Sequence, residues 1–192
     1  MGNLFGSEET TTKTKDSSSM RVTFVGSKSS GKSSLILTLS GSSKAGSIPF
    51  DADYHAFKDC VKSVEEGEMK TSKGDSITLA DSRDEDDYQK LVDASMSSSR
   101  AVVILVSSKK AGFSNLEPDE SYKRALEYMK RVPGKIPIII VYSRADLLGK
   151  DDVDPSMKKT DDDRIVRTIK LSSKTRSGIA DIKEAIEKVV YG

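Results

Sequence analysis

Residues 26–33 constrain the fold of this chain more than any other segment. Their sequence, GSKSSGKS, matches the pattern G-x-x-x-x-G-K-[ST]. The segment follows an alternating apolar stretch, residues 20–25, which predicts a strand, and it precedes a helical pattern over residues 33–39. In such a strand, loop and helix, backbone N–H groups and the positive end of the helix dipole point toward bound phosphates. The sequence therefore predicts a phosphate-binding loop in an α/β fold.

The residue types in this loop suit the chemistry of a nucleotide. Gly26 and Gly31 permit the backbone angles that turn N–H groups inward. Lys32 is expected to bridge the terminal phosphates, and the hydroxyl of Ser33 to bind the Mg²⁺ that those phosphates share. The remaining candidates for nucleotide contact are Ser29, Ser30 and Ser34. A Ser- and Gly-rich turn without a ligand is the alternative, and the position between strand and helix favours phosphate binding.

Hydrophobic patterns in the rest of the chain predict a mostly parallel sheet flanked by helices. Further strands are expected at residues 76–80, 101–106, 136–142 and 165–171, and helices around residues 122–129 and 179–189. Two of these strands are continuously apolar, which indicates that helices cover both of their faces, and the last is expected near the sheet edge. Alternating strands and helices indicate right-handed βαβ crossovers. A hairpin in which residues 60–64 pair with residues 77–79 would add a sixth, antiparallel strand.

The composition of the chain argues against several classes of protein. The 31 Lys and Arg against 30 Asp and Glu leave a formal charge of +1, which argues against nucleic acid as a partner. The apolar runs are shorter than the roughly 18 residues that a membrane span needs. The single Cys60 excludes an intrachain disulfide and fits a reducing compartment. Residues 7–19 are polar, and residues 1–19 are expected to form a flexible leader before one domain, residues 20–192.

A second motif lies near the C-terminus, where residues 171–179 read LSSKTRSGI. Together with the phosphate loop, this motif makes residues 20–190 resemble the Ras superfamily of small GTPases, whose SAKT guanine loop has Ala at the position of Ser173. The resemblance implies that the backbone N–H of Ser173 binds guanine O6, with Ser172 and Lys174 beside it. It also implies the family's fold, a P-loop NTPase with a Ras-like, mostly parallel six-stranded sheet flanked by helices.

Residues 143–146, SRAD, correspond by position to the family's N-K-x-D motif. A carboxylate at Asp146 would accept hydrogen bonds from guanine N1–H and N2–H₂, a donor pair that adenine lacks. The resemblance implies that Arg144 covers the base and that Ser143 replaces an Asn which ties this loop to the phosphate loop. Because Ser is shorter than Asn, it is expected to make fewer of these bonds. The alternative is that Asp146 only caps a helix.

The expected switch segments depart from the family pattern. Residues 81–91, DSRDEDDYQKL, align with the family's DTAGQEDYDRL. The alignment implies that Asp81 holds Mg²⁺ through water and that Glu85 stands at the catalytic Gln, with Asp84 at the usual Gly. These two carboxylates either repel a γ-phosphate or lie in a solvated loop. The family's first-switch Thr is absent, because no Thr lies between Thr38 and Thr71.

Two smaller questions stay open from the sequence. Lys28 either offsets the acidic loop beside the γ-phosphate or is simply solvated. The Met1-Gly2 start resembles Arf-type myristoylated proteins, but residue 6 is Gly where that motif has Ser or Thr. The expected location is therefore the cytoplasm, with weak contact between the N-terminus and a membrane as the alternative.

The sequence thus predicts a small guanine-nucleotide-binding protein that takes GTP or GDP with Mg²⁺ and acts through protein effectors or regulators. Because the γ-phosphate contacts are altered, GTP hydrolysis is expected to be weak or absent. One alternative is a pseudo-GTPase that serves as a structural adaptor and binds nucleotide constitutively or not at all. The other is a P-loop enzyme such as a small kinase, although no lid segment or cluster of basic substrate-binding residues is visible in the sequence.

Overall fold

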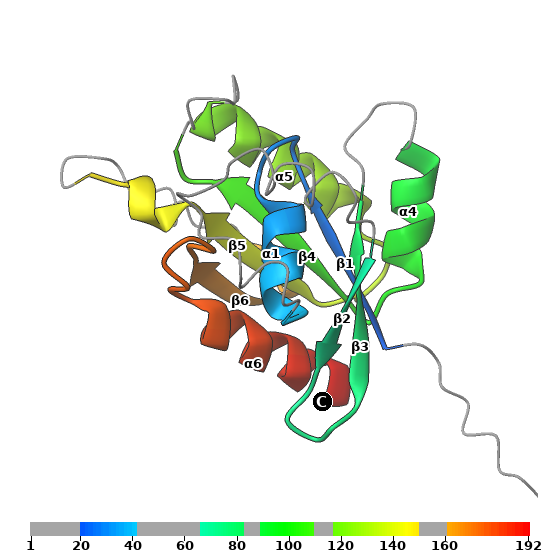
Figure 1. Cartoon of the computed structure of the whole chain (residues 1–192). Helices are drawn as coiled ribbons and strands as arrows, with labels where there is room; N and C mark the ends of the chain where they lie inside the picture. Colours follow the sequence, from blue (N-terminus) through cyan, green and yellow to red (C-terminus); the bar gives the residue numbers. More distant parts are fainter. Residues whose placement is uncertain (1–19, 42–65, 83–88, 110–116, 150–160) are drawn as a thin grey trace, which may run out of the picture.

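A six-stranded sheet forms the centre of the chain in the computed structural model (Figure 1). The structure describes residues 20–41, 66–82, 89–109, 117–149 and 161–192. The strands, in their order across the sheet, are β2 (Glu66–Lys70), β3 (Ser76–Asp81), β1 (Arg21–Gly26), β4 (Ala101–Ser107), β5 (Ile138–Ser143) and β6 (Ile165–Lys170). The β2–β3 pair is antiparallel and the other four pairs are parallel. The predicted mostly parallel sheet is confirmed, with β6 at its edge.

Helices cover both faces of this sheet. They are α1 (Lys32–Leu39), α4 (Gln89–Ser97), α5 (Pro118–Arg131) and α6 (Ile179–Tyr191), with a short 3-10 helix, η2 (Ala145–Leu147), after β5. Apolar residues of α1 and α6 belong to the core cluster on one face, and those of α4 and α5 to the cluster on the other. Among the described residues, no helix is both long and apolar enough to cross a membrane.

The central strand β4 shows why its sequence is apolar without interruption. All seven of its residues are buried, and successive side chains alternate between the two core clusters. Ala101, Val103 and Leu105 pack toward α1 and α6, whereas Val102, Ile104 and Val106 pack toward α4 and α5. All six residues of β5 are buried as well, so the prediction of two strands covered on both faces is confirmed.

The predicted hairpin exists, but its first strand was placed wrongly. The partner of β3 is β2, with Lys70 opposite Ser76 and Met69 opposite Ile77. The predicted strand, residues 60–64, lies outside the described residues. A short turn at residues 71–75 forces the partner of β3 to end at Lys70, and Met69 is the one fully buried residue of β2. The strand therefore lacks the apolar pattern on which the prediction relied.

The tip of this hairpin contacts the last turns of α6, and Figure 1 shows the C-terminus beside it. The hydroxyl of Tyr191 donates to a carboxylate oxygen of Asp75 at 2.7 Å and lies 2.9 Å from the hydroxyl of Thr71. The backbone N–H and the hydroxyl of Ser72 donate to the two carboxylate oxygens of Glu187, at 3.0 and 2.5 Å. These four contacts join the sheet edge to the C-terminal end of α6.

The predicted helices are present, and one helix was not predicted. α1, α5 and α6 contain the residues expected to be helical. In α5, however, the buried face includes Ser121 and Tyr128, whereas Tyr122 and Leu126 are only half-buried. α4 was missed, because its few apolar residues give no clear helical pattern.

Candidate functional site

The loop at residues 26–33 leaves the carboxyl end of β1 and enters α1, as the sequence predicts. Gly26 has a φ of 149°, and a Cβ built there would lie 2.6 Å from the carbonyl oxygen of Leu105. Gly31 has a φ of 99°, which also favours glycine. The N–H of Ser30 donates to the carbonyl of Ser27 at 3.0 Å and closes the turn. Both glycines therefore have the conformational role that the motif requires.

Lys32 is buried at the base of this loop. Its ammonium donates to the carbonyls of Gly26 at 2.8 Å and Ser27 at 3.2 Å. The loop backbone thus fixes the cation at the point where terminal phosphates are expected. Of the other candidates, Ser30 is buried and Ser34 is half-buried, with its carbonyl accepting the hydroxyl of Thr38 at 2.8 Å.

The two predicted Mg²⁺ ligands are in contact. The hydroxyl of Ser33, in the first turn of α1, donates to a carboxylate oxygen of Asp81, at the end of β3. Burial raises the pKa of Asp81, while the charge of Lys32 and the Ser33 hydrogen bond act in the opposite direction. The hydroxyl of Ser33 and the half-buried carboxylate of Asp81 are adjacent oxygen ligands that fit Mg²⁺. The ion would favour the ionised form of Asp81 and take its other ligands from phosphate and water.

Ser143 ties the end of β5 to the phosphate loop. Its hydroxyl donates to the carbonyl of Ser30 at 2.6 Å, with the carbonyl of Val106 at 3.3 Å as the second acceptor in range. Ser143 therefore makes a link to the phosphate loop, while the expectation that it makes fewer bonds than the family's Asn stays a prediction. The two segments lie close together: a Cβ built at Gly31 would be 3.8 Å from the Cβ of Ser143. A short side chain can therefore span the gap.

Arg144 follows with a left-handed backbone, φ 60°. Its guanidinium donates to the hydroxyl of Ser107 at 3.1 Å and to the carbonyl of Ser29 in the phosphate loop. Burial lowers the pKa of Arg144 and the charge of Asp146 opposes that shift, but a guanidinium stays charged at neutral pH. Asp146 is exposed and lies inside η2, whose N-cap is Arg144. Asp146 is therefore not the cap residue that the alternative interpretation requires.

The predicted guanine loop lies beside this segment. The N–H of Ala145 donates to the carbonyl of Leu171 at 3.1 Å. Ser172 is buried, and its hydroxyl accepts the N–H of Thr175 at 3.1 Å, which shapes the turn before α6. Ser173 is half-buried and Lys174 is exposed. Gly178, with φ 75°, is the N-cap of α6, and a Cβ there would meet the carbonyl of Lys170 at 2.3 Å.

Of the remaining predicted residues, the structure describes some and not others. Asp84 and Glu85 lie outside the described residues, as do the leader and the segment at residues 42–65. Lys28 is exposed on the phosphate loop, as both of its interpretations require.

Sequence reasoning missed a group of buried serines beneath the loop. The hydroxyl of Ser121, on α5, lies 3.1 Å from the hydroxyl of Ser27 and accepts the N–H of Ser107 at 2.9 Å. The signal that could have identified Ser121 is its spacing, four residues before Ala125 and seven before Tyr128 on the buried face of α5.

Comparison with known proteins identifies the fold of the chain that contains this site. No protein-family model and no curated protein sequence matches the chain. Among solved structures, the FeoB G-domain from Methanococcus jannaschii is similar, with a TM-score of 0.59 and 17% sequence identity. The match covers 91% of this chain and 99% of that chain. The fold is therefore that of a P-loop GTPase G-domain.

Proposed function

We propose that this chain is a small guanine-nucleotide-binding protein of the Ras superfamily that binds GTP or GDP with Mg²⁺. The observation that carries the proposal is the linkage of three segments far apart in sequence. Ser143 and Arg144 each donate a hydrogen bond to the phosphate loop, and Ala145 donates to Leu171 beside the guanine loop. Segments that one guanine nucleotide would have to contact together are thus joined at the carboxyl ends of β1 and β5.

The chemistry of each segment supports guanine as the base. The N–H groups of the phosphate loop and the ammonium of Lys32 suit phosphates, and Ser33 with Asp81 suits Mg²⁺. Asp146 is exposed and directly follows Ala145, whose N–H is bonded to Leu171 beside the guanine loop. In this position its carboxylate can accept the N1–H and N2–H₂ donors of guanine. Adenine has no such donor pair and would leave the carboxylate unpaired.

We expect GDP to bind at least about tenfold more tightly than ADP, about 1.4 kcal/mol, in calorimetry with Mg²⁺. Asp146→Asn should weaken GDP and shift the preference toward xanthosine diphosphate, whose edge has an acceptor where guanine has its amino group. The matched control is Asp161→Asn, an exposed residue just before the amino end of β6, which should leave both affinities unchanged. Equal affinity of the parent protein for GDP and ADP would overturn the guanine assignment.

We further propose that this protein hydrolyses GTP weakly or not at all. It acts through protein effectors or regulators in trafficking or signalling. In the sequence, Asp84 and Glu85 replace the Gly and Gln that contact the γ-phosphate and orient water in the family it resembles. Like charges about 4 Å apart repel by about 1 kcal/mol in water and about 4 kcal/mol at an effective dielectric constant of 20. We propose that it works in the cytoplasm, with weak membrane contact through the N-terminus as an alternative.

Single-turnover GTP hydrolysis tests this part of the proposal. The parent protein should show little hydrolysis, and the double variant Asp84→Gly with Glu85→Gln should recover some of it. Hydrolysis by the parent protein at the rate of ordinary members of the Ras superfamily would contradict the proposal. The nucleotide released when the purified protein is denatured, identified by chromatography, shows independently whether the site is filled.

A further inference from the structure

Ser121 is a fully buried polar residue on the inner face of α5, beneath the phosphate loop. A serine in a helix usually points to solvent or bonds to its own helix four residues earlier. Here the hydroxyl instead bonds to two other segments, the backbone N–H of Ser107 and the hydroxyl of Ser27. Each of these two contacts has a separate structural role.

The first contact completes the end of the sheet. β1 and β4 pair from Val22 opposite Ala101 to Gly26 opposite Leu105, where β1 ends and the phosphate loop begins. β4 continues to Ser107, and the N–H of the next residue, Ser108, donates to Ser143 of β5. Because successive N–H groups of a strand point to opposite sides, the N–H of Ser107 points toward the side that β1 has left. The hydroxyl of Ser121 satisfies it.

The second contact reaches the phosphate loop itself. Accepting the N–H of Ser107 leaves Ser121 its own hydroxyl proton, and the oxygen of Ser27 lies 3.1 Å away. The carbonyl of Ser27 in turn accepts both the N–H of Ser30 and the ammonium of Lys32. The residue that Ser121 holds is therefore the residue that closes the loop and helps to fix Lys32.

We infer that Ser121 is a positioning residue for phosphate binding, acting through Ser27 on the phosphate loop and Lys32. This inference rests on the proposed function for its effect on nucleotides, and on the Ser27–Ser121 contact for its structural part. The contact between Ser27 and Ser121 couples α5 to the loop, so its loss alters phosphate affinity without touching the base-recognition loop.

A double-mutant cycle with Ser27→Ala and Ser121→Ala tests the coupling. Each single variant should raise the Kd for GDP with Mg²⁺ about three- to tenfold, because each removes the contact between Ser27 and Ser121. Ser121→Ala also removes the bond to the N–H of Ser107 and should have the larger effect of the two. The double variant should resemble the weaker-binding single variant, not the product of the two effects, because both substitutions remove the same contact. The ratio of GDP to ADP affinity should stay constant, since Asp146 is untouched.

The matched control is Ser99→Ala, which removes another buried hydroxyl, bonded to Thr23 of β1. It should lower the free energy of unfolding to a similar extent and leave the Kd for GDP unchanged. Amide hydrogen exchange over residues 26–32 in nucleotide-free protein adds a readout that does not need a ligand. Exchange there should be faster in Ser121→Ala and in Ser27→Ala, and unchanged in Ser99→Ala.

An unchanged Kd for GDP in both single variants, or independent effects in the double variant, would overturn the inference. If Ser121→Ala does not fold, Ser27→Ala removes the same contact from the loop side and decides the question with the two readouts above. A parent protein that binds no nucleotide would overturn the proposed function and the effect on affinity. The exchange experiment would still decide whether Ser121 holds the loop.

Discussion

The helices α6 and α4 pack on opposite faces of the sheet and are attached to it in different ways. α6 buries Ile182 and Ile186 completely and Ala185 almost completely, with further apolar residues partly buried along its length. α4 buries Val92 and Met96, and its Ser95 also forms hydrogen bonds with the hydroxyl of Thr23 on β1. One helix is held mainly by apolar burial and the other in part by directional polar contacts.

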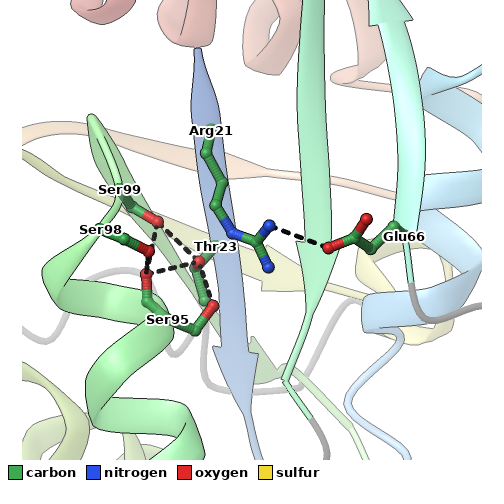
Figure 2. A network of polar contacts seen from close by, with 6 residues as sticks. All are labelled: Arg21, Thr23, Glu66, Ser95, Ser98 and Ser99. Atoms are coloured by element: carbon green, nitrogen blue, oxygen red, sulfur yellow. Dashed lines mark hydrogen bonds and ion pairs between the residues drawn. The ribbon is translucent and has the colours of Figure 1, made fainter. Parts of the chain in front are cut away.

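Figure 2 shows the hydroxyl contacts of α4. The hydroxyl of Thr23, buried on β1, lies 2.8 Å from that of Ser95 and 2.7 Å from that of Ser99. Ser99 donates its N–H to Met96, so the carbonyl of Ser95 is satisfied by hydroxyls instead, from Ser99 at 2.8 Å and Ser98 at 3.0 Å. The same group of residues therefore ends the helix and attaches it to the sheet.

The difference shows which helix can move at lower cost. A buried apolar side chain contributes about 1.5–3 kcal/mol, whereas a hydroxyl hydrogen bond contributes about 1 kcal/mol, because water can replace the partner. α4 begins directly after residues 83–88, which include Asp84 and Glu85. We therefore expect the helix that follows the proposed switch segment to detach more easily than α6.

The largest effect should come from the apolar attachment. Ile186→Ala should lower the free energy of unfolding by about 2–5 kcal/mol, because it removes buried methyl groups and leaves a cavity. Chemical denaturation measures this, with Glu184→Gln, exposed on the same helix, expected to stay within about 0.5 kcal/mol of the parent. A loss below about 1 kcal/mol for Ile186→Ala would remove the contrast between the helices.

A smaller effect should come from the hydroxyl attachment. Thr23→Val keeps the shape of the side chain but leaves the hydroxyls of Ser95 and Ser99 facing a methyl group, and should cost about 1–3 kcal/mol. Adding Ser99→Ala should then cost less than Ser99→Ala alone, because the Ser99 hydroxyl has already lost its contact with Thr23 and keeps only its bond to the carbonyl of Ser95. A neutral Thr23→Val variant would show that the network does not hold α4.

The smallest effect should come from the polar contacts at the end of α6. Tyr191→Phe removes the hydrogen bond to Asp75, which is exposed, and the contact with Thr71. Water can replace the bond to Asp75, so the loss in unfolding free energy should be smaller than that of Thr23→Val. A larger loss would show that α6 also depends on polar contacts.

The same contrast explains which elements the sequence predicts. β4, β5 and α6 carry continuous or periodic apolar residues, because they pack by apolar burial, and each is recognisable from the sequence. Among the side chains that the structure describes, α4 buries the apolar residues Val92 and Met96, and β2 buries only Met69, so neither element gives a periodic signal. Elements held by hydroxyls or by an edge pairing are specified by their neighbours, which a pattern along one segment does not contain.

The residues of the candidate site also differ in whether the sequence predicts them. Lys32, Ser33 and Asp81 were predictable, because a motif and the end of a strand fix their places. The bond from Ser143 to the loop and the role of Ser121 were not, because each depends on how closely two distant segments approach. A short hydroxyl side chain has no sequence signal for the distance that it must span.

The contacts between the hairpin tip and α6 imply that the sheet edge cannot slide on its own. Shifting β2 and the tip by two residues along β3 would displace Ser72 by about 7 Å and break its bonds to Glu187. Any such slippage must carry the last turn of α6 with it or release it first. The other end of β2 starts at Glu66, which is paired with Arg21 at 2.9 Å and directly follows residues 42–65, where the first-switch Thr would be expected. A protein bound to the C-terminal end of α6 would therefore hold the register of β2 along its whole length, as far as the ion pair between Glu66 and Arg21.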